Sequence, residues 1–375
     1  RRRRMKRHLL VTNDYPPKVG GIQNYLWELW KRLPNEKVTV FTPGHVDARA
    51  FDVGQGHSIV RDKRKVFLPT RALAADIRNL AHQVDAELVI LDPALPLGHL
   101  APSLGIPYAV IAHGAEVALP GRLPVAKHLL RRVLLGAEFV ISAGGYPAAE
   151  ALRAAGKPIE TVVIPPGVDG CRFAPLSSAA VIGQHRERLG LGDGPVVVGL
   201  SRLVPRKGFD RTIAAVAALR SEFPDIQLVI GGTGRDEARL ERIANKADLP
   251  VRFLGRIEES ELPFIYGVAD VFVMPCRSRW AGLEQEGFGI VFLEAAASGV
   301  PQVAGLSGGS HEAVVDGVTG YVINDPKESG AIADAIHSIL ASPSRRSEMS
   351  QRSRERVESS LSYDILAEQL RAALS

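Results

Sequence analysis

Short apolar runs alternate with longer amphipathic segments along the whole chain. The first runs cover residues 8–13 and 38–41, and others follow at 88–91, 108–112, 139–142 and 162–164. Between them, segments such as 71–84 repeat apolar residues three and four positions apart, which is typical of a helix with one buried face. The alternation predicts an α/β fold in which parallel strands and helices form a doubly wound sheet.

The same alternation begins again in the second half of the chain. Residues 165–169, Pro-Pro-Gly-Val-Asp, are rigid and turn-rich, and a polar stretch without strand character follows up to Gly194. New apolar runs then cover residues 196–201, 228–230, 251–254 and 271–275. We therefore expect two domains, residues 1–168 and 169–358, with a last helical segment at about 359–375.

One short segment of the second half is unusual in its polarity. Glu286 precedes the turn Gly287-Phe288-Gly289, and an apolar helix is predicted from Ile290 to residue 298, before Gly299 and Pro301. The two turn glycines would let a ligand approach the unpaired N–H groups of the first helical turn. Such a helix start is an anion site, and phosphate is the most plausible anion.

Two carboxylates flank this predicted phosphate site. Glu286 lies before the first turn and Glu294 about one turn inside, at a separation on the order of 10 Å. A nucleoside diphosphate sugar fits this spacing, with one carboxylate on the ribose hydroxyls and the other on the sugar hydroxyls. The alternative is a short buried helix with incidental acids, whose carboxylates would need partners that the segment itself does not supply.

Residues 286–294, Glu-Gly-Phe-Gly-Ile-Val-Phe-Leu-Glu, closely resemble the donor signature of the retaining glycosyltransferases of family 4. Members of this family have the GT-B fold, in which two Rossmann-like domains face each other across a cleft. The resemblance implies that the first domain binds the acceptor and the second the nucleotide sugar. It also implies that the helix at 359–375 packs back on the first domain.

The resemblance also assigns roles to individual residues. Arg202 and Lys207 match the paired cations that hold the donor diphosphate, while Arg206 is expected to face solvent. Gly20 and Gly21 follow the first strand in a loop that faces the diphosphate and the acceptor, although a simple tight turn would explain them too. The implied catalytic residues are His113, Arg202, Lys207 and Glu286. The implied donor-binding residues are Gly20, Gly21, Gly232, Arg256, Ile257, Gly287, Phe288, Gly289, Ile290, Val291 and Glu294.

Composition narrows the possible partners. The net charge is +5, but six cations lie at the start of the chain, in Arg1–Arg4, Lys6 and Arg7, so the remainder is nearly neutral and no nucleic-acid partner is expected. The sequence has no Asp-x-Asp run of the kind that holds a divalent ion, and we expect no metal and no cofactor. No apolar run approaches the length of a membrane span, so any membrane contact would be peripheral.

A basic amphipathic helix is predicted within residues 122–135. Lys127, Arg131 and Arg132 fall on one arc of the helix and apolar residues on the other. This segment is either an ordinary surface helix or a face that contacts anionic lipid headgroups. With Asp14 and Tyr15 of the first loop, its three cations are the residues that we assign to the membrane or the acceptor.

Over nearly its whole length the chain resembles actinobacterial phosphatidylinositol mannoside mannosyltransferases, above all those that add the second, α-1,6-linked mannose. This implies GDP-mannose as donor, an inositol phospholipid as acceptor, and a cytoplasmic enzyme peripherally associated with the inner face of the plasma membrane. Two alternatives stay open. One is a UDP-sugar-dependent transferase of the same family with a soluble acceptor, and the other is a non-catalytic two-domain sugar-binding protein.

Overall fold

The computed structural model describes residues 4–279 and 285–375. The chain forms two compact units, one made of Arg1–Pro166 together with Tyr363–Ser375 and the other of Gly167–Ser362. The last helix, α15 (Tyr363–Ala373), thus belongs to the unit that contains the start of the chain. In the described ranges, no helix is long and apolar enough to cross a membrane.

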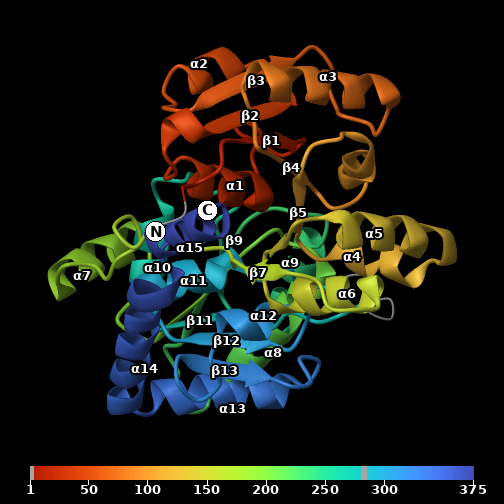
Figure 1. The fold of residues 1–375 in the computed structure, drawn as a ribbon. Coiled ribbons are helices and arrows are strands. Elements are labelled where there is room, and N and C mark those ends of the chain that lie inside the picture. The colour runs from red at the N-terminus through yellow and green to blue at the C-terminus, as the bar shows by residue number, and fades with distance from the viewer. Residues whose placement is uncertain (1–3, 280–284) are drawn as a thin grey trace. The chain divides into compact units, whose positions relative to one another are not determined.

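The first unit is built on a parallel sheet in the order β3-β2-β1-β4-β5-β6-β7 (Figure 1). Its strands are β1 (His8–Thr12), β2 (Val38–Pro43), β3 (Ser58–Asp62), β4 (Leu88–Asp92), β5 (Tyr108–Ala112), β6 (Val140–Ser142) and β7 (Thr161–Val163). Its longer helices are α1 (Gly21–Trp30), α3 (Arg71–Gln83), α5 (Pro124–Gly136) and α6 (Gly145–Ala155), besides α15, and its shorter ones include α2 (Ala48–Asp52) and α4 (Ala115–Ala118).

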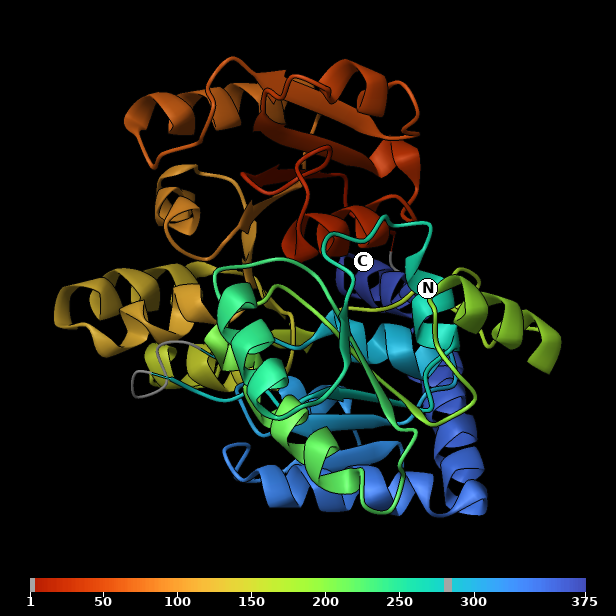
Figure 2. The same cartoon turned by 180° about the vertical axis from the view of Figure 1, so that it is seen from behind.

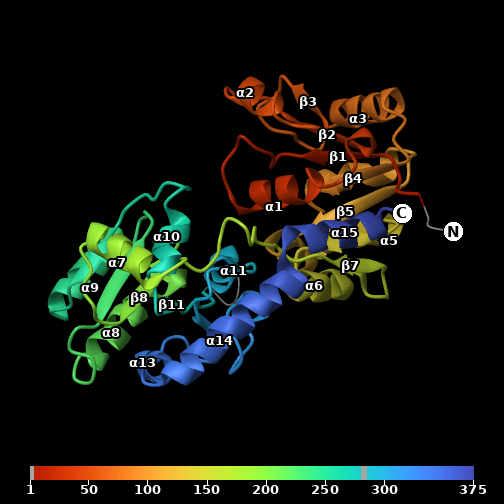
Figure 3. The same ribbon diagram turned by 90° about the vertical axis from the view of Figure 1, so that its left-hand side faces the viewer.

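Helices cover both faces of this sheet. Leu9 and Val11 of β1 pack into a core shared with α3, α5 and α6, whereas Leu10 packs into a second core shared with α1 and α15. Figure 3 shows α15 lying beside α1, which it contacts. Strands buried on both faces explain why the sequence presents them as continuous apolar runs.

Strand β3 was not predicted from the sequence. It pairs only with β2 at one edge of the sheet, and its residues, Ser-Ile-Val-Arg-Asp, are exposed or half-buried. An edge strand needs no continuous apolar run, so the signal used for the central strands is absent. The predicted central strands are present, with ends that differ by one or two residues.

The second unit has a parallel sheet in the order β10-β9-β8-β11-β12-β13. Its strands are β8 (Val196–Leu200), β9 (Gln227–Gly231), β10 (Val251–Phe253), β11 (Val271–Met274), β12 (Gln302–Gly305) and β13 (Gly320–Ile323). Its helices are α7 (Ala179–Arg188), α8 (Phe209–Leu219), α9 (Glu237–Lys246), α10 (Leu262–Gly267), α11 (Ile290–Ala297), α12 (Ser310–Ala313), α13 (Ser329–Leu340) and α14 (Pro343–Arg356). Helix α13, in blue, packs beside α8 in this unit (Figure 2).

Helix α11 is the element that the glycine-rich turn was expected to begin. It starts at Ile290 directly after Gly289, which has φ 86°, and Gly299 in the left-handed conformation (φ 72°) follows its end. Phe292, Leu293 and Ala295 to Ala297 are buried in the core of the unit. The short apolar helix predicted from the sequence is therefore confirmed.

Candidate functional site

The carboxylate of Glu286 lies against two cations that come from the loop after β8. Lys207 Nζ donates a hydrogen bond to Glu286 Oε2 at 2.7 Å, and the guanidinium of Arg206 pairs with the same oxygen. The side chains of all three residues are largely enclosed, with exposures of 9% for Lys207, 10% for Glu286 and 14% for Arg206. The structure thus brings together two of the predicted catalytic residues, Lys207 and Glu286.

Charge explains how this acid remains ionised inside the protein. Burial alone raises the pKa of Glu286, but the neighbouring Lys207 and Arg206 charges and hydrogen bonds outweigh it, so its pKa is lowered. Arg206 was expected to face solvent, and that expectation is wrong. Its neighbour Lys207 is buried too, because the loop turns both side chains toward the acid.

The backbone of Glu286 is held by the loop after β12. The Glu286 N–H donates to Ser307 Oγ at 3.3 Å, and the Gly309 N–H donates to the Glu286 carbonyl at 3.0 Å. A Cβ on Gly308 would lie 2.1 Å from that carbonyl oxygen, so only glycine fits there. The loop after β12 therefore fixes the backbone of Glu286.

The fold requires glycine at one of the two turn positions but not at the other. Gly289 has φ 86°, and a Cβ there would lie 2.6 Å from the Phe292 ring, so the fold itself requires glycine. Gly287 is exposed, and a Cβ there would meet no atom of the described chain within 4 Å. Phe288, between them, is buried in the core and contributes packing. Ile290 and Val291 form the first turn of α11, with half-buried side chains.

Glu294, the second acid of the motif, has a partner in α10. The buried Tyr266 hydroxyl donates a hydrogen bond of 2.6 Å to Glu294 Oε2. Burial raises the pKa of Glu294 to about 7, partly opposed by the Tyr266 hydrogen bond. The sequence had given no role to Tyr266.

The other predicted donor residues lie where strands of the same parallel sheet end. Arg202 follows β8, Gly232 follows β9, and Arg256 and Ile257 follow β10. Gly232 packs directly against the backbone of Ser201, and a Cβ on it would lie 1.9 Å from the Ser201 carbonyl oxygen. Arg202 and Arg256 are exposed, and neither has a carboxylate within ion-pair distance among the described residues. Ligands of open α/β sheets bind at this edge.

In the first unit, His113 follows β5 and is fixed by a buried acid from β4. His113 Nε2 lies 2.6 Å from Asp92 Oδ1, and the Thr12 hydroxyl donates to Asp92 Oδ2 at 2.6 Å. Burial lowers the pKa of His113, but the Asp92 charge and hydrogen bond more than offset this, so the net shift is upward. Asp92, a residue that the sequence had not singled out, therefore favours the cationic form of the imidazole.

The loop after β1 is held by its own side chains. Asp14 Oδ1 accepts hydrogen bonds from Lys18 at 2.6 Å and Gln23 at 2.5 Å, and a Cβ on Gly20 would collide with Gln23. Gly21 begins α1. Tyr15 is 2% exposed, and its hydroxyl lies 2.8 Å from His57 Nε2. The Tyr15 ring therefore has no surface with which to meet a membrane, and its assignment to the acceptor stays a prediction.

Helix α5 has the amphipathic form predicted for it. Leu130, Val133 and Leu134 are buried, whereas Lys127, Arg131 and Arg132 are exposed. Within the described ranges, no three His, Cys, Asp or Glu side chains form a group that could hold a metal ion. Metal independence itself stays a prediction.

Comparison with known proteins places both units in one family. Residues 19–170 match the model described as Glycosyltransferase Family 4, and residues 181–356 match that described as Glycosyl transferases group 1. The chain is 43% identical to GDP-mannose-dependent alpha-(1-6)-phosphatidylinositol monomannoside mannosyltransferase of Mycolicibacterium smegmatis over 91% of both chains. The enzyme of the same name from Mycobacterium tuberculosis H37Rv is 40% identical over 98% of this chain and 97% of its own.

The chain belongs to glycosyltransferase family 4. A further relative, from Corynebacterium glutamicum, is named as a monoacylated phosphatidylinositol monomannoside mannosyltransferase and is 36% identical over 97% of each chain. Solved structures agree on the fold of the transferase. Anabaena Alr3699/HepE in complex with UDP has a TM-score of 0.82 at 20% identity, covering 98% of this chain and 99% of that one. The two sheets are thus those of a GT-B glycosyltransferase, as the sequence predicted.

Proposed function

We propose that this transferase moves mannose from GDP-mannose to a phosphatidylinositol mannoside and forms the α-1,6 linkage of the second mannose. The observation that carries the proposal is the similarity over more than 90% of the chain to enzymes named for this reaction in three actinobacterial genera. The donor site described above supplies the chemistry that such a transfer needs.

The main chemical task is to stabilise the departing nucleoside diphosphate. Negative charge grows on the diphosphate as the glycosidic bond breaks, and preorganised cations and N–H groups lower that barrier. The first turn of α11 after Gly289 offers N–H groups, and Arg202 and Lys207 offer cations. In this proposal the diphosphate binds there without a metal ion.

The two glutamates then bind opposite ends of the donor. Glu286 orients the sugar, and its neighbours Lys207 and Arg206 keep it ionised as a hydrogen-bond acceptor. Glu294, fixed by Tyr266, binds the ribose hydroxyls. His113, whose cationic form Asp92 favours, stabilises charge near the transferred sugar.

A transfer assay tests the donor and the acceptor together. Radiolabelled GDP-mannose, UDP-glucose and UDP-N-acetylglucosamine are offered in parallel with vesicles that contain phosphatidylinositol monomannoside, with and without a chelator. We expect label in the lipid from GDP-mannose only, unaffected by the chelator, and released by an α-1,6-specific mannosidase. Transfer from a UDP sugar instead would overturn the donor assignment, and a product resistant to that mannosidase would overturn the linkage.

The proposed location is the cytoplasmic face of the plasma membrane, reached through the cations of α5. Vesicle flotation tests this with the double variant Lys127→Glu, Arg131→Glu. We expect wild-type protein to float with vesicles that contain anionic lipid and the variant to stay in solution. The matched control is Lys246→Glu, an exposed lysine on α9 of the other unit. Equal flotation of all three proteins would reject this surface.

A further inference from the structure

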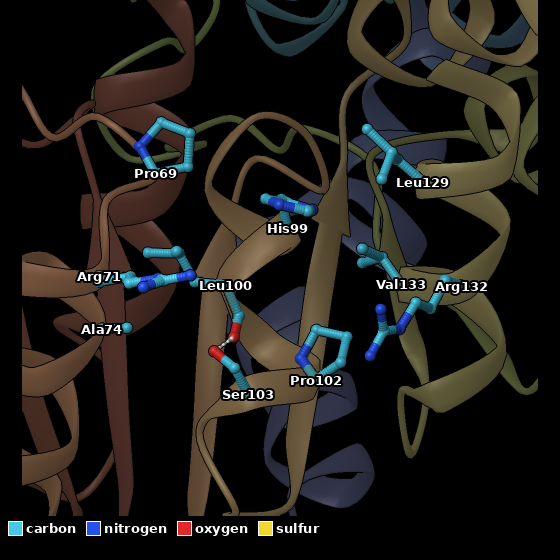
Figure 4. A pocket seen from close by; sticks show the side chains of 10 residues that line it. All are labelled: Pro69, Arg71, Ala74, His99, Leu100, Pro102, Ser103, Leu129, Arg132 and Val133. Atoms are coloured by element: carbon cyan, nitrogen blue, oxygen red, sulfur yellow. Dashed lines mark hydrogen bonds between the residues drawn. The ribbon is translucent and has the colours of Figure 1, made fainter. Parts of the chain in front are cut away.

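The first unit contains a pocket to which the proposed reaction gives no role. It has a volume of about 370 Å³ and lies between α3, a 3-10 helix at Leu97–Ser103 and α5 (Figure 4). Neither His113 nor the glycines of the first loop line it. The pocket is therefore a candidate second site on the domain.

The polar part of the pocket is cationic. Arg71 from the start of α3 and Arg132 from α5 reach in from opposite sides, and His99 lies between them (Figure 4). The Ser103 hydroxyl is also part of the lining, but it already donates to the Leu100 carbonyl at 2.7 Å. The lining includes no Asp or Glu.

The two arginines of the pocket have no protein anion beside them. In the described part of the chain, neither Arg71 nor Arg132 has a carboxylate within ion-pair distance, and the same holds for Arg78 and Arg131 of the same helices. What distinguishes Arg71 and Arg132 from Arg78 and Arg131 is that they line the pocket. Two guanidinium groups that converge on one pocket without a protein anion provide a site for a phosphate, which arginine binds in a fork geometry.

The rest of the pocket is apolar. Leu100 and Val133 are buried beneath it, and Leu129 is 39% exposed at its side. One helical turn before Leu129, on the same face of α5, Val125 is 77% exposed. A free phosphate would leave this apolar surface unused, whereas a phosphate that carries an apolar group would cover part of it.

We propose that this pocket binds a phosphate ester that carries an apolar group, namely the phosphodiester and adjoining glycerol-acyl region of an anionic phospholipid that is not the acceptor. Arg71 and Arg132 bind the phosphate, and the apolar wall takes the beginning of an acyl chain. This deepens the proposed membrane association and rests on it, but it does not depend on the sugar donor or the linkage. Such a site would hold the first unit on the membrane by one defined lipid as well as by diffuse charge.

The test uses the full chain and a lipid that dissolves as a monomer. Dihexanoylphosphatidylglycerol, below its critical micelle concentration, carries the anionic phosphodiester but no inositol, so it does not mimic the acceptor. Binding is measured by titration calorimetry beside inorganic phosphate and dihexanoylphosphatidylcholine. We expect the phosphatidylglycerol to bind at least about tenfold more tightly than either comparison compound, because only it has both the net charge and the acyl group.

Paired substitutions separate the pocket from general surface charge. Arg132→Gln and Arg131→Gln each remove one exposed arginine of α5, but only Arg132 lines the pocket. We expect Arg132→Gln to weaken lipid binding about tenfold and Arg131→Gln to leave it unchanged, and we expect Arg71→Gln to weaken it to a similar extent as Arg132→Gln. Unchanged circular dichroism and melting temperature in each variant show that it is folded.

Three results would overturn the pocket assignment. The first is that the short-chain lipid does not bind, and the second is that inorganic phosphate binds as tightly as the lipid does. The third result is that Arg132→Gln and Arg131→Gln lose the same amount of lipid affinity. The assay needs neither membrane nor sugar transfer. It therefore fails or succeeds independently of the mannosyl transfer assay, and a protein that transfers mannose but does not bind the lipid refutes the pocket alone.

Discussion

Lys207 donates a hydrogen bond of 2.7 Å to Glu286, and both side chains are about nine-tenths enclosed. The two residues come from different strand ends of one sheet, 79 positions apart in the sequence. A buried ion pair is costly to break from one side, because the partner left behind is a charge without compensation. Experiments on this site therefore have to separate loss of folding from loss of function.

Glutamine is the more informative substitution at Glu286 for this reason. Glu286→Ala removes the carboxylate that Lys207 and Arg206 share, at a cost of about 3–5 kcal/mol in the free energy of unfolding. Glu286→Gln keeps a hydrogen-bond acceptor but not the charge, so we expect it to cost less stability than Glu286→Ala and to reduce kcat about 10²–10³-fold. Glu294→Ala should raise mainly the KM for the donor. Steady-state kinetics and thermal melts measure both effects, and near-native kinetics in both variants would refute the assigned roles.

The two turn glycines allow a matched comparison. Gly287→Ala adds a Cβ that meets no atom of residues 4–279 or 285–375 within 4 Å, so its melting temperature should equal that of the wild type. Its affinity for the donor diphosphate should fall about tenfold, because the methyl group would obstruct a phosphate near the start of α11. Gly289→Ala should instead lower stability by about 1–3 kcal/mol through backbone strain and contact with Phe292. Native donor affinity in Gly287→Ala would show that no ligand approaches there.

The acid that fixes His113 should control the pH dependence of turnover. The pKa of His113 is raised above its ordinary value by Asp92, so the cationic imidazole persists to higher pH and is lost as the pH rises through the folded-state pKa. Asp92→Asn removes that charge, and we expect the alkaline limb of the kcat profile to move to lower pH. The control Thr12→Val removes a hydrogen bond to Asp92 but leaves the Asp92 charge in place, so it should shift the alkaline limb of the kcat profile less. An unchanged limb in Asp92→Asn would mean that His113 does not act as a cation.

Glu294 should make the protein less stable as the pH rises. Its pKa is about 7 in the folded protein against an ordinary 4.5, so the folded state holds this proton more tightly than the unfolded state does. The resulting stability is present below pH 4.5 and is lost as the pH rises through 7. Between pH 5 and pH 8, the free energy of unfolding of the wild type should fall by about 2–3 kcal/mol relative to that of Glu294→Gln, because the glutamine cannot ionise. Urea unfolding at both values measures the difference, and a constant difference would contradict the raised pKa.

Much of the fold could be predicted because its signals are local. Most strands buried on both faces appear as apolar runs, although the buried strand β12 was not predicted, and α11 is marked by Gly289 before it and Gly299 after it. The edge strand β3 was not predicted, because its half-exposed residues do not form an apolar run. The donor motif was recognised from a contiguous segment, in which the acids, the glycines and the helix start follow one another.

The sequence by itself determined the two α/β units, the motif and the residues that we assign to the donor. Only the tertiary structure decided which side chains act as partners, because those partners lie far apart in the chain. Asp92 is 21 positions from His113, and Tyr266 is 28 positions from Glu294. Parallel strands end at the same edge of a sheet, and the loops that follow them bring together residues that no local pattern connects. Arg206 shows the limit most clearly, since the sequence indicates a cation in a loop but not whether that cation faces water or a buried acid.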